Sequence, residues 1–285
     1  MNTWVIARNT LGDALRKRVL LVFLLLAMVM LLVALMLNYL TAREQMVTFK
    51  STELAIVLIF GALISITTSI FLIPNEIEKR TIYTVLSKPV QRWEFFLGKF
   101  LGGVLTAFVT LGLMTVVLMI VVFLLSARPP AADLTQVTQG AADQVNASDW
   151  MHRGIREVGL VLQGCYVIFF ELVLLTAIAA TLSLFFSPTV NFAITAFIFV
   201  AGSLQDVLGA WTRRNDIPIT RTLAQVFYYM TPHFQDFNIM GHIVHPEVPL
   251  KMSPVVYGLE VSLYGVVYAM MVLLIGVLVF DRKEV

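Results

Sequence analysis

The chain has 285 residues, of which 59% are hydrophobic and 13% are charged, and its formal net charge is +2. A soluble domain carries about 25% charged residues, so this composition excludes a water-facing globular fold. The small net charge and the scattered basic residues also exclude nucleic acid as a partner. Composition therefore predicts an all-α integral membrane protein with membrane lipid around it.

Residues 1–18 predict a cytoplasmic amphipathic helix at the membrane interface, with one largely apolar face. The uncharged run that follows, residues 19–42, is longer than the apolar region of a secretion signal, so we interpret it as a retained first span. The predicted apolar face consists of Trp4, Ala7, Leu11, Ala14 and Leu15, opposite Asn9, Asp13, Arg16 and Lys17.

Six membrane spans are predicted in a single transmembrane domain, since about 20 apolar residues are needed to cross the bilayer as a helix. The fourth and fifth spans are joined by a very tight turn at Ser187–Pro188, because proline lacks an amide donor and biases Ser187 away from helical dihedrals. The six spans cover about residues 19–42, 54–75, 97–127, 158–186, 189–211 and 257–280.

Basic residues are denser on one side of the predicted membrane. Residues 1–18, 75–99 and 281–285 hold 11 Lys and Arg in 48 positions, whereas residues 43–53, 128–157 and 212–255 hold 9 in 85 positions. The positive-inside rule therefore predicts cytoplasmic amino and carboxyl termini, a cytoplasmic loop at 75–96 and outer loops at 128–157 and 212–255. We expect a multi-pass protein of the plasma (inner) membrane.

Catalytic motifs are missing from the sequence. The nearest fragment to a phosphate-binding loop, Leu97-Gly98-Lys99-Phe100, lacks both the first glycine and the final hydroxyl residue. His233, His242 and His245 match no metal-ligand spacing. We therefore expect no catalytic residue, no metal and no cofactor on this chain, and we do not predict an enzyme.

The cytoplasmic loop predicts a short helix from Glu76 to Ser87. Asn75 is suited to cap the first turn and Glu78 stands where a capping box places an acidic residue. Pro89 disfavours a helical conformation at Lys88 and so ends the helix. A helix of this kind lies along a membrane surface or enters a groove on a cytoplasmic partner.

The pattern Glu76-x-Glu78-x-x-Thr81-x-x-x-Val85-Leu86-Ser87-Lys88-Pro89-Val90-x-Arg92-x-Glu94-x-x-x-Gly98-Lys99 resembles the loop between the second and third spans of ABC type-2 permeases. The resemblance implies a coupling helix that docks into a separate ATPase subunit, which binds the ATP and Mg²⁺. It also implies export and a second permease copy or a related permease as partner. Family members often have glycine at the position of Arg80.

The residues expected to contact the ATPase are Glu76, Ile77, Glu78, Arg80, Thr81, Ile82, Val85, Leu86, Ser87 and Pro89. The alternative is that this segment is only a charged loop between two helices. The resemblance extends to Pro232-His233-Phe234 with Phe237-Asn238, which is similar to the outer segment of such permeases, where short helices bend back toward the bilayer.

Glu171 falls midway along the fourth predicted span, where an ionisable group costs about 2.5–3.5 kcal/mol on insertion scales. It either lines a cavity of the translocation path and binds a cationic substrate, or it is protonated or hydrogen-bonded to a neighbouring helix. Asp206 and Glu260 are expected to be solvated charges near the outer ends of spans.

The function expected from these observations is that of the transmembrane subunit of an ATP-binding cassette exporter. Two alternatives stay open. One is a secondary transporter or channel, and the other is an ABC-linked membrane scaffold that serves the maturation of an extracytoplasmic enzyme.

Overall fold

The computed structural model describes residues 3–37, 45–74, 91–126, 147–205, 231–239 and 254–282. These ranges contain helices and no strand, which confirms the all-α prediction for the described part of the chain. The elements are α1 (Thr3–Leu15), α2 (Arg18–Leu37), α3 (Gln45–Ile70), α6 (Arg92–Ser126), α7 (Ala147–Leu182), α8 (Pro188–Ser203), the 3-10 helix η3 (Phe234–Phe237) and α12 (Pro254–Arg282).

Four of these helices contain a segment long and apolar enough to cross a membrane: Phe49–Ile70, Trp93–Ser126, Gly154–Leu182 and Val255–Asp281. A fifth is obtained if α1 and α2, which are bent by 67° at their junction, form one span. The apolar helix α8 is shorter, with 16 residues. The chain is a multi-pass membrane protein, and the count of six spans stays a prediction.

Two helices begin earlier than the predicted spans. Helix α3 begins at Gln45, inside the segment 43–53 that was interpreted as an outer loop, and α7 begins at Ala147, inside the outer loop 128–157. Hydropathy detects the apolar part of a helix and misses polar turns that continue it. The turn at Ser187–Pro188 lies where it was predicted: Ser187 is extended, with φ −62° and ψ 155°, and Pro188 opens α8.

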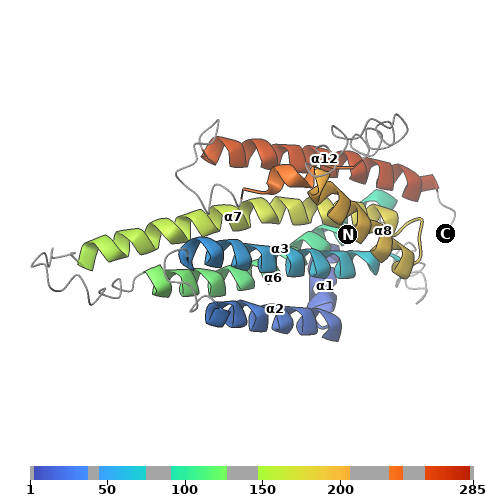
Figure 1. Cartoon of the computed structure of the whole chain (residues 1–285). Coiled ribbons are helices and arrows are strands. Elements are labelled where there is room, and N and C mark those ends of the chain that lie inside the picture. The colour runs from blue at the N-terminus through green and yellow to red at the C-terminus, as the bar shows by residue number, and fades with distance from the viewer. Residues whose placement is uncertain are drawn as a thin grey trace, which may run out of the picture.

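Helix α7 lies at the centre of the bundle, between α12 and α3 (Figure 1). Contacts between helices give their directions. Gly61 of α3 meets Leu172 of α7, and the same helices meet again at Lys50 and Glu157, so α3 and α7 run parallel. Gly103 of α6 meets Thr176, whereas Gly154 meets Phe123, so α6 runs antiparallel to α7.

Helix α12 runs parallel to α7. The Tyr166 hydroxyl is 3.2 Å from the Ser262 hydroxyl, and about four turns later the Thr181 hydroxyl donates to the Val272 carbonyl at 3.3 Å. At the far end of α12, Gly276 meets Phe96 near the start of α6. The start of α6 and the end of α12 therefore share one end of the bundle, and both chain termini lie toward that end (Figure 1).

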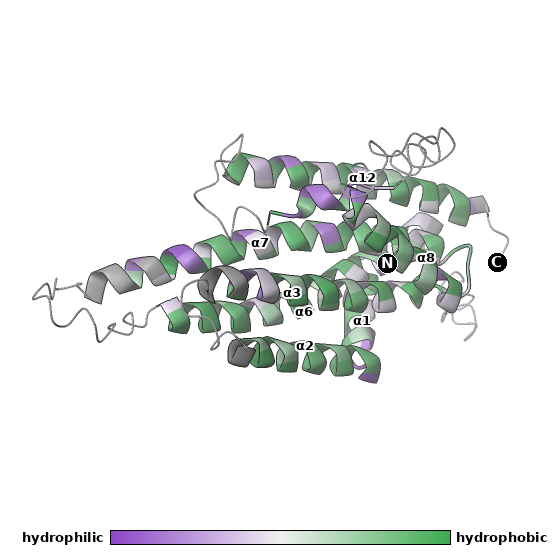
Figure 2. Ribbon diagram, in the orientation of Figure 1, coloured by the Kyte–Doolittle hydropathy of each residue, from purple (hydrophilic) through white to green (hydrophobic). Residues whose placement is uncertain are grey.

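Apolar side chains cover the outside of the bundle as well as its interior. Large hydrophobic residues are exposed along the length of α2 and α12, for example Leu25 and Leu278. Figure 2 shows that α2, α6 and α12 are apolar on most of their surface, with hydrophilic residues gathered at the start of α2 and in the first third of α7. An exposed apolar belt of this extent is the surface expected of helices that face lipid.

Helix α1 crosses the end of the bundle and packs against the start of α6 (Figure 1). Its buried residues are Ile6, Ala7, Thr10 and Ala14. Of the predicted apolar face, Ala7 and Ala14 pack inside the bundle, whereas Trp4, which is 62% exposed, and Leu15 lie on the outside. Close approach of two helix backbones favours small side chains at the contact, and Ala7, Thr10 and Ala14 supply them on α1 beside Ile6.

Candidate functional site

The predicted ATPase-coupling residues, from Glu76 to Pro89, lie outside the described residues. The elements that flank them are described. After α3 ends at Ile70, Leu72 and Ile73 are buried. On the other side, Phe95 and Phe96 in the first turn of α6 are also buried. The described residues on both sides of the predicted coupling segment are therefore anchored in the core of the protein.

The first turns of α6 are held between α1 and α12. On one side, a methyl group in place of the Gly98 hydrogen would lie 2.8 Å from Ile6 Cβ, and one at Gly102 would lie 2.4 Å from Thr10 Cβ. On the other side, the rings of Phe95 and Phe96 lie 6.3 and 6.1 Å from the Phe280 ring.

The backbone contact between α1 and α6 leaves no room for a side chain on α6. The Gly98-x-x-x-Gly102 spacing is the pattern that allows two membrane helices to pack at this distance. The Thr10 hydroxyl at the contact donates to the Ile6 carbonyl at 2.8 Å, so this buried polar group is satisfied within its own helix. A movement of the start of α6 must therefore carry α1 with it.

Glu171 is buried in α7, with 3% of its surface exposed. It lines a small cavity of ≈ 20 Å³ together with Leu54 and Leu58 of α3. A cavity of this volume has room for about one water molecule. The carboxyl group that was predicted to lie midway along the fourth span is therefore enclosed by the bundle and kept from lipid.

The other wall of this cavity comes from the segment 231–239. Phe237, Asn238 and Ile239, at the end of η3, line it opposite α3. The segment bends into the bundle: Phe237 packs against Gly265 of α12, and Phe234 against Gly202 of α8. Residues of the outer region that the resemblance singled out therefore border the space beside Glu171.

Hydrogen bonds hold the segment 231–239 in place. The Gln205 side-chain amide donates to the Thr231 hydroxyl at 2.8 Å. The Tyr257 hydroxyl donates to the Asp236 carbonyl at 2.7 Å, and the His233 amide donates to the Tyr264 hydroxyl at 3.1 Å. These bonds tie η3 to α12 and to the end of α8, so the position of η3 depends on both helices.

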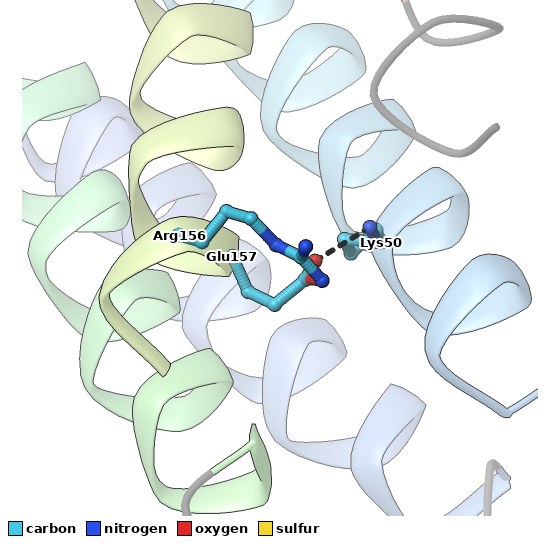
Figure 3. A network of polar contacts seen from close by, with 3 residues as sticks. All are labelled: Lys50, Arg156 and Glu157. Atoms are coloured by element: carbon cyan, nitrogen blue, oxygen red, sulfur yellow. Dashed lines mark hydrogen bonds and ion pairs between the residues drawn. The ribbon is translucent and has the colours of Figure 1, made fainter. Parts of the chain in front are cut away.

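A buried ion pair joins α3 to α7 about four turns before Glu171 (Figure 3). Lys50 Nζ lies 2.8 Å from Glu157 Oε2, and the two side chains are 4% and 16% exposed. Arg156 approaches the other oxygen of the same carboxylate at 3.6 Å from an exposed position. The sequence prediction missed this pair, because both residues were assigned to outer loops.

Glu53 lies one turn after Lys50 and is 1% exposed. Among the described residues, neither of its carboxylate oxygens has a hydrogen-bond partner. Sequence reasoning missed Glu53 too, since the predicted span began at residue 54. The available signal that the helix starts earlier was that Lys50 and Glu53 are three residues apart, directly before an apolar run.

These carboxyl groups are suited to hold a cation, a proton or a hydrogen-bond donor. An unpaired charge in a low-dielectric interior is unfavourable, so a buried carboxyl is either neutral or paired with a positive group. Within the described ranges, His, Cys, Asp and Glu side chains do not gather in groups of three that would hold a metal ion. Glu260 is exposed near the start of α12, and Asp206 lies outside the described residues.

A bundle of long apolar helices with charged residues enclosed between them defines a polytopic membrane protein with a polar interior. The sequence matches the family model of the ABC-2 family transporter proteins over residues 4–285. The chain therefore belongs to this family, as the resemblance indicated, and it is the membrane subunit of an ATP-binding cassette transporter. Membership implies an ABC ATPase as partner in general. A search of curated proteins finds no match.

Proposed function

We propose that the chain is the transmembrane subunit of an ABC exporter and that residues 76–90 transmit the movement of a separate ATPase subunit to the helices around the translocation path. The family match over residues 4–285 carries this proposal. The sequence also lacks a phosphate-binding loop of its own, which agrees with nucleotide hydrolysis on a separate polypeptide.

The packing at the ends of residues 76–90 supports a coupling role. The segment leads directly into α6, whose first turns contact α1 at Gly98 and Gly102 and α12 at Phe280. Packed helices shift as rigid bodies, because a close-packed interface does not deform continuously. A displacement of this segment would be passed through the start of α6 to α1 and to the end of α12.

The proposed path runs beside Glu171. The cavity next to its carboxyl group lies between α3, α7 and the η3 segment. A second copy of the chain, or a related permease, would complete the path. The substrate in this proposal is exported, and Glu171 contributes a polar contact along its route.

The coupling role is tested in the complex of the chain with its ATPase. Val85→Asp and Leu86→Asp place a charge on the predicted apolar face of the coupling helix, and Tyr83→Asp places the same charge on the opposite face. The first two variants should lose the ATPase activity that depends on the permease, while Tyr83→Asp keeps it. Unchanged ATPase activity in an intact complex with all three variants would contradict coupling and favour a scaffold.

Transport in sealed vesicles separates the proposal from an ion-driven transporter. The proposed exporter requires ATP on the side of the coupling segment and is inactive under an ion gradient alone. Transport that continues without ATP and follows an ion gradient would refute the proposal. ATP hydrolysis by the purified chain without a partner would also refute the assignment of ATP hydrolysis to a separate subunit.

The proposed topology has six spans with both termini in the cytoplasm of a cell bounded by this plasma (inner) membrane. Cys165 is the only cysteine and is buried, so single-cysteine labelling is practical after Cys165→Ser. A cysteine from Thr138→Cys should react with an impermeant reagent in intact cells. A cysteine from Thr84→Cys should react only after the membrane is opened, and the reverse result would invert the orientation.

A further inference from the structure

An apolar groove opens between the start of α2 and the end of α3. Its volume is ≈ 290 Å³, close to the ~300 Å³ of the smaller sites that hold organic ligands. Its walls are formed by Val19 and Phe23 of α2, by Ile64 of α3 and by Phe71 in the turn that follows α3. The groove lies on the outside of the bundle, where the helices face lipid.

Two basic residues lie at the end of the groove where α2 begins. Lys17 and Arg18 both line it, and Lys17 Nζ lies 5.2 Å from the centre of the Phe71 ring. Arg18 is exposed, and among the described residues no carboxylate lies within ion-pair distance of its guanidinium group. Apolar walls and a cationic end give the groove two chemically distinct halves.

The bend between α1 and α2 is the expected level of the lipid headgroups. Lys17 and Arg18 occupy the 67° bend between α1, which crosses the end of the bundle, and α2, which enters the apolar belt (Figures 1 and 2). Phosphate groups lie at this depth, and the positive end of the α2 dipole adds to the attraction for an anion. Basic pockets between membrane helices at this level are typical sites for anionic lipid headgroups.

We infer that this groove binds an anionic phospholipid. Its phosphate pairs with Lys17 and Arg18, and one acyl chain lies along Val19, Phe23 and Ile64. Charge complementarity selects this occupant, because a zwitterionic lipid would bring its own cation to a site that already holds the exposed Arg18 guanidinium group. This inference goes beyond the proposed function, on which it depends only for the assignment of the groove to the cytoplasmic leaflet.

Native mass spectrometry of the purified full-length chain tests the headgroup contact. The protein is exchanged into equal amounts of phosphatidylglycerol and phosphatidylcholine, and the ratio of the two retained lipids is measured. Each basic residue near a membrane surface contributes about 1 kcal/mol, or about fivefold. Lys17→Gln and Arg18→Gln should each lower the ratio by about that factor, whereas Arg16→Gln, which removes a charge outside the groove, should lower it clearly less.

A second pair of variants tests the acyl-chain contact without changing charge. Val19 lines the groove and is 52% exposed, whereas Leu21 is 51% exposed and lies outside it. Val19→Trp should fill the groove and reduce retained phosphatidylglycerol several-fold. Leu21→Trp adds the same bulk to the lipid-facing surface of α2 and should have no effect. Because both positions face outward, neither variant disturbs the core.

Several outcomes would overturn the inference. Two results would show that the groove does not select the headgroup. One is equal retention of the two lipids, and the other is an equal loss of phosphatidylglycerol with Arg16→Gln and with Arg18→Gln. Displacement of the lipid by inorganic phosphate would assign a site for free anions instead. If Val19→Trp converted a dimer into monomers and left lipid retention unchanged, the groove would be a contact between copies of the chain.

Discussion

The contact between α1 and α6 makes a quantitative prediction about Gly102. In Gly102→Ala, the new methyl carbon would lie 2.4 Å from Thr10 Cβ and 3.0 Å from the Ala7 carbonyl oxygen. Carbon atoms in contact prefer a separation of about 3.5–4.0 Å. Both obstructing atoms are fixed to the α1 backbone, so a change of rotamer cannot relieve the overlap, and α1 must move away from α6.

A matched variant separates the cost of moving α1 away from α6 from the effect of helix propensity. Gly112 lies on the same helix, and a methyl group there would have nothing within 4 Å. Alanine in place of glycine favours a helix by about 1 kcal/mol at either position, so this gain cancels in the comparison. Overpacking costs about 1–3 kcal/mol. Gly102→Ala should therefore be less stable than Gly112→Ala by about 1–3 kcal/mol.

Thermal unfolding of the two variants in the same detergent measures this difference. For a protein of more than 150 residues, each kcal/mol corresponds to about 2–4 °C in Tm. The permease-dependent ATPase activity of the complex should fall in Gly102→Ala and not in Gly112→Ala. Adding Thr10→Gly to Gly102→Ala removes the nearest obstructing atom and should recover part of the loss. Equal stability of Gly102→Ala and Gly112→Ala would refute the packing of α1 on α6.

Lys50→Met removes the buried partner of the Glu157 carboxylate and leaves only the exposed Arg156 beside it, so it should lower stability by up to about 3–5 kcal/mol in thermal unfolding, whereas the exchange Lys50→Glu with Glu157→Lys should recover most of it. Glu53→Leu removes a buried carboxyl group with no hydrogen-bond partner among the described residues. The variant should unfold at a higher temperature, by the equivalent of about 1–3 kcal/mol. Asn191 donates to the Ala179 carbonyl at 2.9 Å between α8 and α7, so Asn191→Ala should cost about 1–3 kcal/mol.

Controls and contrary results differ among these variants. Asn9 is exposed on α1, and Asn9→Ala should leave the unfolding temperature unchanged, in contrast to Asn191→Ala. A charge exchange that recovers nothing would show that the geometry around Lys50 and Glu157 matters more than their attraction. If Glu53→Leu were less stable than the parent chain, the carboxyl group would have to bind a stabilising partner.

Hydropathy predicted the helices that face lipid, because a membrane helix needs a long apolar run regardless of its partners. Four of the expected spans lie on helices long and apolar enough to cross a membrane, and Glu171, which was placed midway along the fourth run, is buried in α7. Proline chemistry placed the turn at Ser187–Pro188. These features depend on local sequence, so a single chain is enough to predict them.

The features that the sequence did not yield depend on contacts between distant residues. Lys50 and Glu157 are separated by 107 positions, and each alone is typical of a charged loop beside a span. The apolar face of α1 was predicted to lie at the membrane interface, and the close packing of α1 on α6 was not predicted. On α6, the spacing of the glycines at 98 and 102 indicated that another helix packs closely there. This signal was not used to predict the contact with α1.

The length of α7 has a consequence for the exterior of the cell, given the proposed orientation. Its 36 residues extend about 54 Å at 1.5 Å per residue, and the hydrocarbon layer is about 30 Å thick. The helix therefore projects into the aqueous phase, where its hydrophilic first turns lie, while its other half carries Glu171 in the interior. A protein bound to the projecting tip would twist or tilt the same rigid rod that borders the buried carboxyl group.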